Sequence, residues 1–93
     1  MGNLRLMTDY TVIDGLFGEL LAVSQPYLTK AEAVEVQGLL DQAEYQAALE
    51  TFVHIFIEGG KSATEHVFSL LFRLSGLMGM PMDDTLQSIP RLR

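Results

Sequence analysis

The amino-acid sequence predicts an all-α protein, a small antiparallel four-helix bundle with a short fifth helix near its C-terminus. Apolar residues recur at helical spacing over most of the chain, and no segment shows a clean alternation of β-branched residues. Residues that cap or stop helices divide the chain into segments with short connections. Short connections favour antiparallel packing of neighbouring helices.

The length and composition indicate one folded domain spanning residues 1–93. A hydrophobic share of 48% is typical of a packed globule. We expect the core to extend from about residue 9 to 80, with weakly ordered ends. The chain has no cysteine, which excludes disulfides and thiolate metal sites and favours a cytoplasmic location. No run of apolar residues is long enough to span a membrane.

The first helix is predicted from Asp9 to Ser24, with Pro26 ending it. Its apolar residues repeat at intervals of three and four positions, which is the pattern of a helix with one buried face. They are Val12, Ile13, Leu16, Phe17, Leu20 and Leu21.

The second helix is predicted from Lys30 to about Leu40. Thr29 and Glu32 have the spacing of a capping box, in which each side chain bonds the other's backbone amide. Its apolar stripe is narrow, so we expect this helix to be peripheral. Asp41 stands three residues before Glu44, which suggests a break and a new N-cap. A single helix over residues 30–58 is the competing interpretation.

The third helix is predicted from Gln42 or Ala43 to Glu58, and Gly59-Gly60 is a strong stop signal. It is the most apolar segment, so it should be the central helix. A further capping box at residues 62–65 predicts the start of the fourth helix, which Gly79 and Pro81 end. Two aspartates at residues 83–84 predict the cap of a last helical turn reaching about Gln87.

The distribution of charge is more informative than the net charge of −6. Between residues 6 and 90 there are twelve acidic residues against three basic ones. Such a surface repels nucleic acid and anionic membranes, and it attracts a basic protein partner. We therefore expect neither a nucleic acid nor a membrane as the partner.

The candidate catalytic and metal-binding patterns are weak. Glu50, His54 and Glu58 follow one another at intervals of four residues and could ligate a divalent metal. They lack the spacings of known helical metal sites, so a solvated polar stripe is the favoured interpretation. No nucleophile motif or phosphate-binding loop is present. We expect a protein that is not an enzyme and needs no cofactor or metal.

Several acidic residues have no basic neighbour in sequence. Asp41 and Glu44 can be explained as residues of a helix start, but Glu35, Glu50 and Glu58 have no such local role. A surface for a basic partner explains them, with a tyrosine as a further contact, because tyrosine is enriched at binding hot spots. The predicted contact residues are Glu35, Asp41, Glu44, Tyr45, Glu50 and Glu58.

The segment "LLDQAEYQAALETFVHIFIE" resembles the central part of the MafI family of bacterial immunity proteins. The resemblance covers roughly residues 30–80 and includes the later segment "LFRLSGLMGM". It implies a stoichiometric inhibitor that binds the C-terminal domain of a cognate polymorphic toxin. Many such toxins are nucleases, whose active sites are basic because they hold phosphates. An acidic bundle has the complementary charge for binding such a site.

A second interpretation remains open on the residues alone. The broad apolar stripes could be buried against a second copy of the chain. The protein would then be a small helical adaptor or a homodimerisation module without a toxin partner.

Overall fold

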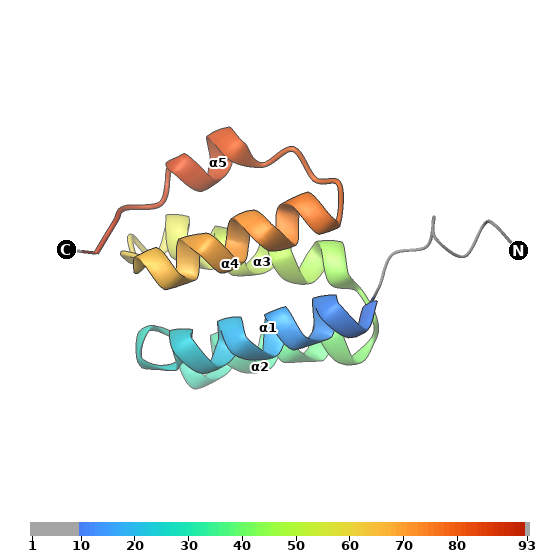
Figure 1. The fold of residues 1–93 in the computed structure, drawn as a ribbon. Coiled ribbons are helices and arrows are strands. Elements are labelled where there is room, and N and C mark those ends of the chain that lie inside the picture. The colour runs from blue at the N-terminus through green and yellow to red at the C-terminus, as the bar shows by residue number, and fades with distance from the viewer. Residues whose placement is uncertain (1–9, 93) are drawn as a thin grey trace, which may run out of the picture.

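The computed structural model describes residues 10–92 as a helical bundle (Figure 1). Its helices are α1 (Tyr10–Ser24), α2 (Lys30–Asp41), α3 (Tyr45–Glu58), α4 (Glu65–Leu77) and the short α5 (Asp83–Gln87). A single 3₁₀ turn, η2 (Gln25–Tyr27), connects α1 to α2. The all-α prediction is confirmed, and no strand occurs in the described part of the chain. Asp9, the predicted first helical residue, and the predicted weak order of residues 1–8 lie outside the described residues.

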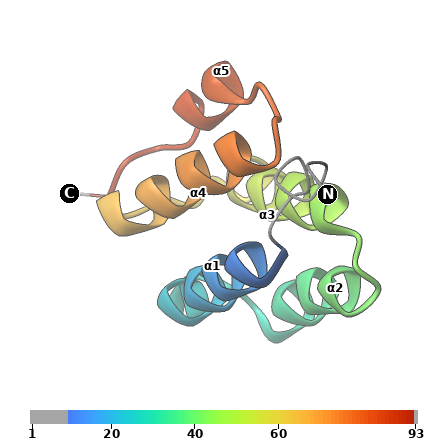
Figure 2. The ribbon, with the colours of Figure 1, turned by 45° about the vertical axis from the view of Figure 1, so that its right-hand side comes forward.

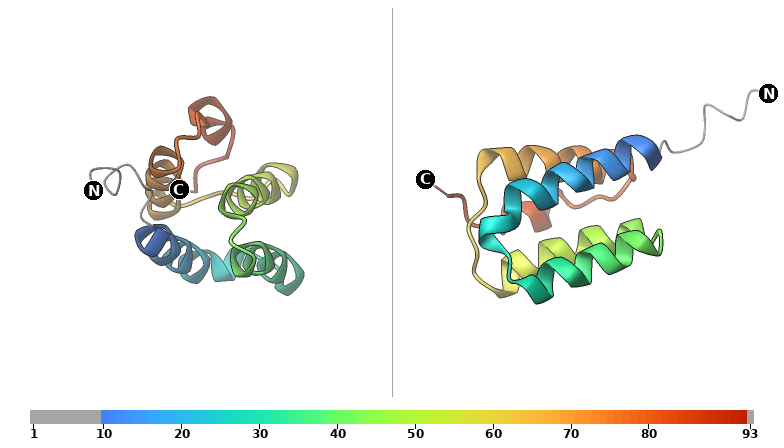
Figure 3. Two further views of the ribbon diagram at one scale, coloured as in Figure 1. Left: turned by 90° about the vertical axis from the view of Figure 1, so that its right-hand side faces the viewer. Right: turned by 90° about the horizontal axis from the view of Figure 1, so that it is seen from below.

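The four long helices run alternately up and down. Seen along their axes, they occupy four corners in chain order, and α5 lies outside them (Figure 3). The closest pairings are α1 with α4 and α2 with α3. α5 lies against α4 and covers one side of the bundle (Figure 2). None of the described helices is long and apolar enough to cross a membrane.

The core confirms the predicted peripheral position of α2 but does not single out α3 as the central helix. α3 buries the residues spaced along one of its faces, namely Ala48, Leu49, Phe52, Val53 and Phe56. α2 buries only Val36 and is peripheral, as predicted. The rings of Phe52 and Phe56 are fully buried and stack with their centroids 4.9 Å apart. α4 buries six residues against five for α3, and it contacts α1, α3 and α5, so the two helices share the core and α3 is not its single centre.

The buried stripe of α1 is narrower than predicted. Ile13, Leu16, Phe17 and Leu20 are buried, but Val12 is 42% exposed. Successive helical residues differ by about 100°, so Val12 is turned to the edge of the stripe that Ile13 occupies.

The start of α2 has the predicted capping box. The Thr29 hydroxyl accepts a hydrogen bond from the Glu32 amide at 3.1 Å, and the Glu32 carboxylate accepts one from the Thr29 amide at 2.9 Å. The Glu32 carboxylate also lies 3.3 Å from the Lys61 ammonium group. One side chain thus fixes a helix start and contacts the α3–α4 connection.

The predicted cap at Asp41 is wrong. Asp41 is the last residue of α2, and its carboxylate accepts a hydrogen bond from the Gln37 side chain one turn earlier. The amides of Ala43 and Glu44 bond the carbonyls of Leu40 and Leu39, which ends α2 in a tight turn. α3 begins three residues later than Gln42, and its N-cap Glu44 makes no side-chain capping bond.

The cap of α4 is also displaced from its predicted position. Thr64, and not Ser62, is the N-cap, and its hydroxyl accepts a hydrogen bond from the Val67 amide at 3.1 Å. The reason is tertiary: the Ala63 amide donates to the Pro90 carbonyl and the Ala63 carbonyl accepts from the Leu92 amide, both at 2.8 Å. These bonds keep residue 63 in an extended bridge outside the helix.

The core continues past residue 80, where the sequence predicted its end. Leu86 and Ile89 are almost fully buried and belong to the same cluster as the α3 and α4 residues. α5 is present as predicted, but Met82 occupies its N-cap position and the two aspartates follow in its first turn.

Candidate functional site

The exposed side of α3 carries a line of polar residues, which we call the α3 edge. It consists of Gln46, Glu50, His54 and Glu58, all exposed. A spacing of four residues places successive side chains one turn apart on one side of a helix. Because the opposite side of α3 is buried in the core, the position of this edge is rigidly fixed by packing.

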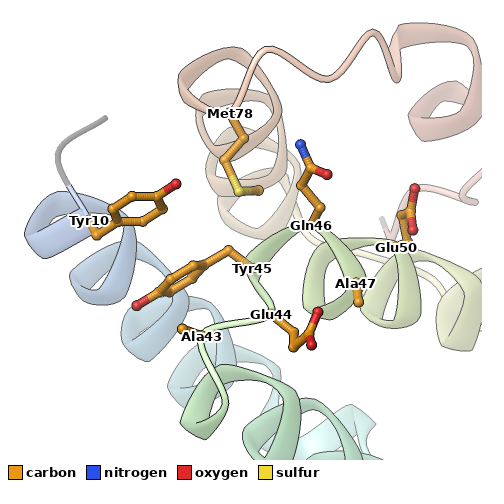
Figure 4. A pocket seen from close by; sticks show the side chains of 8 residues that line it. All are labelled: Tyr10, Ala43, Glu44, Tyr45, Gln46, Ala47, Glu50 and Met78. Carbon is orange, nitrogen blue, oxygen red and sulfur yellow. The ribbon is translucent and has the colours of Figure 1, made fainter. Parts of the chain in front are cut away.

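Three surface hollows adjoin this edge, and Glu50 lines all of them. The largest, of about 570 Å³, lies where α3 begins and is also lined by Tyr10, Tyr45 and Met78 (Figure 4). It therefore joins the start of α1, the start of α3 and the end of α4. Figure 4 shows the two tyrosine side chains next to each other on one side of this hollow.

The two smaller hollows lie on either side of the α3 edge. One, of about 280 Å³, is formed by Glu35 of α2 together with Glu50 and His54. The other, of about 250 Å³, is formed by Glu50 and His54 together with Met82 and Thr85 near the start of α5. Glu50 thus stands at the junction of α2, α3 and α5, with His54 one turn further along.

Tyr45 has a structural role as well as a place in the largest hollow. Its ring stacks on Tyr10 with a centroid separation of 4.8 Å and lies 6.3 Å from the Phe17 ring. The neighbouring Asp14 carboxylate, followed by partial burial of the ring, raises the pKa of the Tyr45 hydroxyl. Tyr45 therefore fastens the start of α3 to α1, and the half-exposed Tyr10 presents more ring surface to solvent.

The carboxylates differ sharply in whether they are paired. Three ion pairs occur among residues 10–92: Glu19 with His66 at 2.6 Å when that histidine is protonated, Glu32 with Lys61 at 3.3 Å, and Glu65 with Arg91 at 2.7 Å. Within the same range no other carboxylate forms an ion pair, and this includes four that lie near the hollows or along the α3 edge. These are Glu35, Glu44, Glu50 and Glu58.

The structure brings together four of the six predicted contact residues. Glu44, Tyr45 and Glu50 line the largest hollow, and Glu35 faces Glu50 across the second. Asp41 and Glu58 line none of the three hollows, although Glu58 continues the α3 edge. Tyr10 was not predicted, because nothing in the sequence indicates that the start of α1 meets the start of α3.

The chemistry of the site is that of a cation acceptor. Among the described residues, no three histidine, aspartate or glutamate side chains are grouped closely enough to hold a metal ion. Unpaired carboxylates accept charge-assisted hydrogen bonds from guanidinium and ammonium groups, and tyrosine faces attract the same cations. The site is chemically suited to accept guanidinium and ammonium groups.

No protein-family model, curated protein or solved structure matches this chain.

Proposed function

We propose that the protein is an immunity protein that binds a basic toxin domain through the α3 edge and its three hollows, and so neutralises the toxin in the cytoplasm. The observation that carries the proposal is the gathering of unpaired carboxylates around Glu50 on the exposed side of α3. We propose further that residues 30–80 are related to the MafI family, although no protein-family model matches the chain.

Electrostatics gives such a surface two advantages. A field of one sign speeds the encounter with an oppositely charged partner, and this effect weakens as salt is added. Hydrogen bonds between charged groups contribute more than neutral ones once they are removed from water. Lysine and arginine side chains that hold RNA or DNA in a nuclease would enter the hollows beside Glu35 and Glu50.

Shape supports the proposal as well. Hollows next to exposed aromatic rings offer places where a partner's side chains become desolvated, which is where binding energy concentrates in interfaces. Tyr10 is half exposed beside the largest hollow, and its stacking on Tyr45 holds it in place. Because α3 packs against the core, its backbone is already ordered before binding, and the entropic cost falls on the exposed glutamate side chains.

The test compares two double variants that change the net charge equally. Glu35→Gln with Glu50→Gln removes two carboxylates from the site. Gln25→Lys with Ser69→Lys adds two positive charges at exposed positions on η2 and α4, outside the three hollows. Each is co-expressed with the toxin domain encoded by the neighbouring gene, and affinity is measured by calorimetry at several salt concentrations.

We expect the glutamine variant to lose at least about a hundredfold in affinity, because it removes two charged hydrogen bonds of about 1.5–3 kcal/mol each and about 1.4 kcal/mol corresponds to tenfold. The glutamine variant should also protect cells less well against the toxin, and its affinity should depend less on salt concentration. The lysine variant should keep most of the protection and most of the salt dependence. Equal affinity and salt dependence for wild type and the glutamine variant would contradict the proposal. A salt-resistant dimer that binds no toxin would instead favour the adaptor interpretation.

A further inference from the structure

Three helices of the bundle end in the same kind of turn, and one of the three turns has an unfavourable residue at its critical position. After α3 and α4, the residue with positive φ is a glycine, Gly60 (φ 62°) and Gly79 (φ 65°). After α2 it is Ala43, with φ 59°. In each turn, the amide of this residue and the amide of the following residue donate hydrogen bonds to carbonyls of the last helical turn.

Ala43 is held in the left-handed region without a compensating contact of its side chain. Its side chain is exposed, and no hydrogen bond can involve a methyl group. A residue with a β-carbon is disfavoured in this region, whereas glycine is not. The α2–α3 turn is therefore strained relative to the other two.

The local sequence also favours helix through this turn. Residues 41–46 read DQAEYQ and contain no glycine, proline or β-branched residue. The first amides of α3 receive no side-chain cap from Glu44. If the backbone of residues 42–44 became helical, those amides would bond the carbonyls of residues 41–43 and the strain at Ala43 would disappear.

We propose that residues 42–44 are a hinge through which α2 and α3 straighten into one helix, so that two copies of the chain exchange their halves. In the exchanged dimer, α1 and α2 of one copy pack against α3, α4 and α5 of the other. The α1–α4 and α2–α3 contacts are the same in both forms, so their contribution largely cancels. The balance is then decided by the hinge and by concentration, and a short strained hinge favours exchange.

The exchange also acts on the candidate site. Ala43, Glu44 and Tyr45 belong to the turn or directly follow it, and they form one wall of the largest hollow. Straightening the turn removes that wall, whereas the hollow between Glu35 and Glu50 is rebuilt from two copies. The inference does not depend on the proposed function, because it concerns a second copy of this chain alone.

The first experiment refolds the full chain from denaturant at concentrations from about 10 µM to about 1 mM and separates monomer from dimer by size-exclusion chromatography with light scattering. We expect a dimer that increases with concentration and exchanges slowly with monomer. Ala43→Gly should lower the dimer association constant at least about tenfold, because each dimer relieves two strained hinges in the wild type and none in the variant.

Gly60→Ala is the matched control, because it places the same strain in the α3–α4 turn. There, the backbone of Ala63 is bonded to Pro90 and Leu92, so a continuous helix is opposed. This variant should lose stability without gaining dimer. A wild type that stays monomeric at every concentration, or a dimer that Ala43→Gly leaves unchanged, would overturn the proposal.

A distance measurement distinguishes exchange from simple contact of two closed monomers. Because the chain lacks cysteine, Val34→Cys with His54→Cys provides two exposed labelling sites, on α2 and α3. In the dimer, diluted with unlabelled chain, exchange predicts an intrachain spin-label distance near 30 Å, since a helix rises about 1.5 Å per residue over the intervening 20 or so residues. A dimer that retains the short distance of the adjacent, closed helices would also overturn the proposal.

Discussion

Ser24 is a polar residue in an apolar setting, at the C-terminal end of α1. Its side chain is fully buried, and its hydroxyl has no hydrogen-bond partner among the described residues. A buried hydroxyl without a partner loses its hydration and gains nothing in return.

We predict that Ser24→Ala raises the free energy of unfolding by about 1 kcal/mol, because the penalty of an unsatisfied hydroxyl is removed and the volume hardly changes. Urea denaturation monitored by circular dichroism measures this directly. Ser69→Ala is the control, since Ser69 lies exposed on α4 and should change stability little. A loss of stability in Ser24→Ala would mean that the hydroxyl is bonded after all.

Glu32 links stability to pH. The hydrogen bond from the Thr29 amide, followed by the neighbouring Lys61, lowers the pKa of its carboxyl below 4.5 in the folded state. A carboxyl with a depressed folded pKa binds fewer protons when folded, so its contribution is fully present above about 4.5 and is lost as pH falls through the folded pKa.

We therefore predict that, as pH falls below the ordinary pKa of a glutamate, the wild type loses stability more steeply than Glu32→Gln does. At neutral pH the variant should be the less stable of the two, because it keeps a weaker capping box. Urea midpoints at a series of pH values measure both effects. Parallel pH curves for the two proteins would show that Glu32 makes no such contribution.

At the scale of elements, the C-terminal segment acts as a clamp on the start of α4. Arg91 lies over the Phe68 ring, with its guanidinium carbon 4.2 Å from the ring centroid, and donates a 2.7 Å hydrogen bond to Glu65. The Ala63 bridge fastens the same segment through its backbone.

Arg91→Ala should lower the free energy of unfolding by about 1 kcal/mol. An exposed cation–π contact contributes about 0.5–1 kcal/mol, and a surface ion pair contributes at most about 1 kcal/mol. Arg73→Ala is the matched control, because Arg73 is exposed on α4 and forms no ion pair among residues 10–92. Chemical denaturation of the two variants gives the comparison. Equal losses would mean that Arg91 acts through general charge and not through its specific contacts.

The helices themselves follow from local sequence, and their ends follow only in part. Periodicity predicted the four long helices, and the Thr29 capping box was confirmed because both partners lie in one segment. Asp41 and Ser62 also had capping sequences, but a local turn displaced the first cap and tertiary hydrogen bonds displaced the second. The end of α2 folds into its own turn, and residue 63 is bonded to a segment almost thirty residues away.

The whole molecule decides which of the acidic residues form a site. The sequence marked Glu35, Glu50 and Glu58 as unexplained, and helical phase placed Glu50 and Glu58 on one side of α3. It could not place Glu35 opposite Glu50, or Tyr10 beside Tyr45, because these meetings depend on how α1, α2 and α3 are packed. The separation of paired from unpaired carboxylates likewise depends on distant partners such as Lys61 and Arg91.

The measurement that tests the central claim most directly is the mapping of amide chemical shifts on the isotope-labelled chain as the unlabelled toxin domain is added. The account predicts that the largest changes fall on Gln46, Glu50, His54 and Glu35, and that they diminish with salt. Changes concentrated instead on the side where α1 meets α4, around Glu19 and His66, would contradict it.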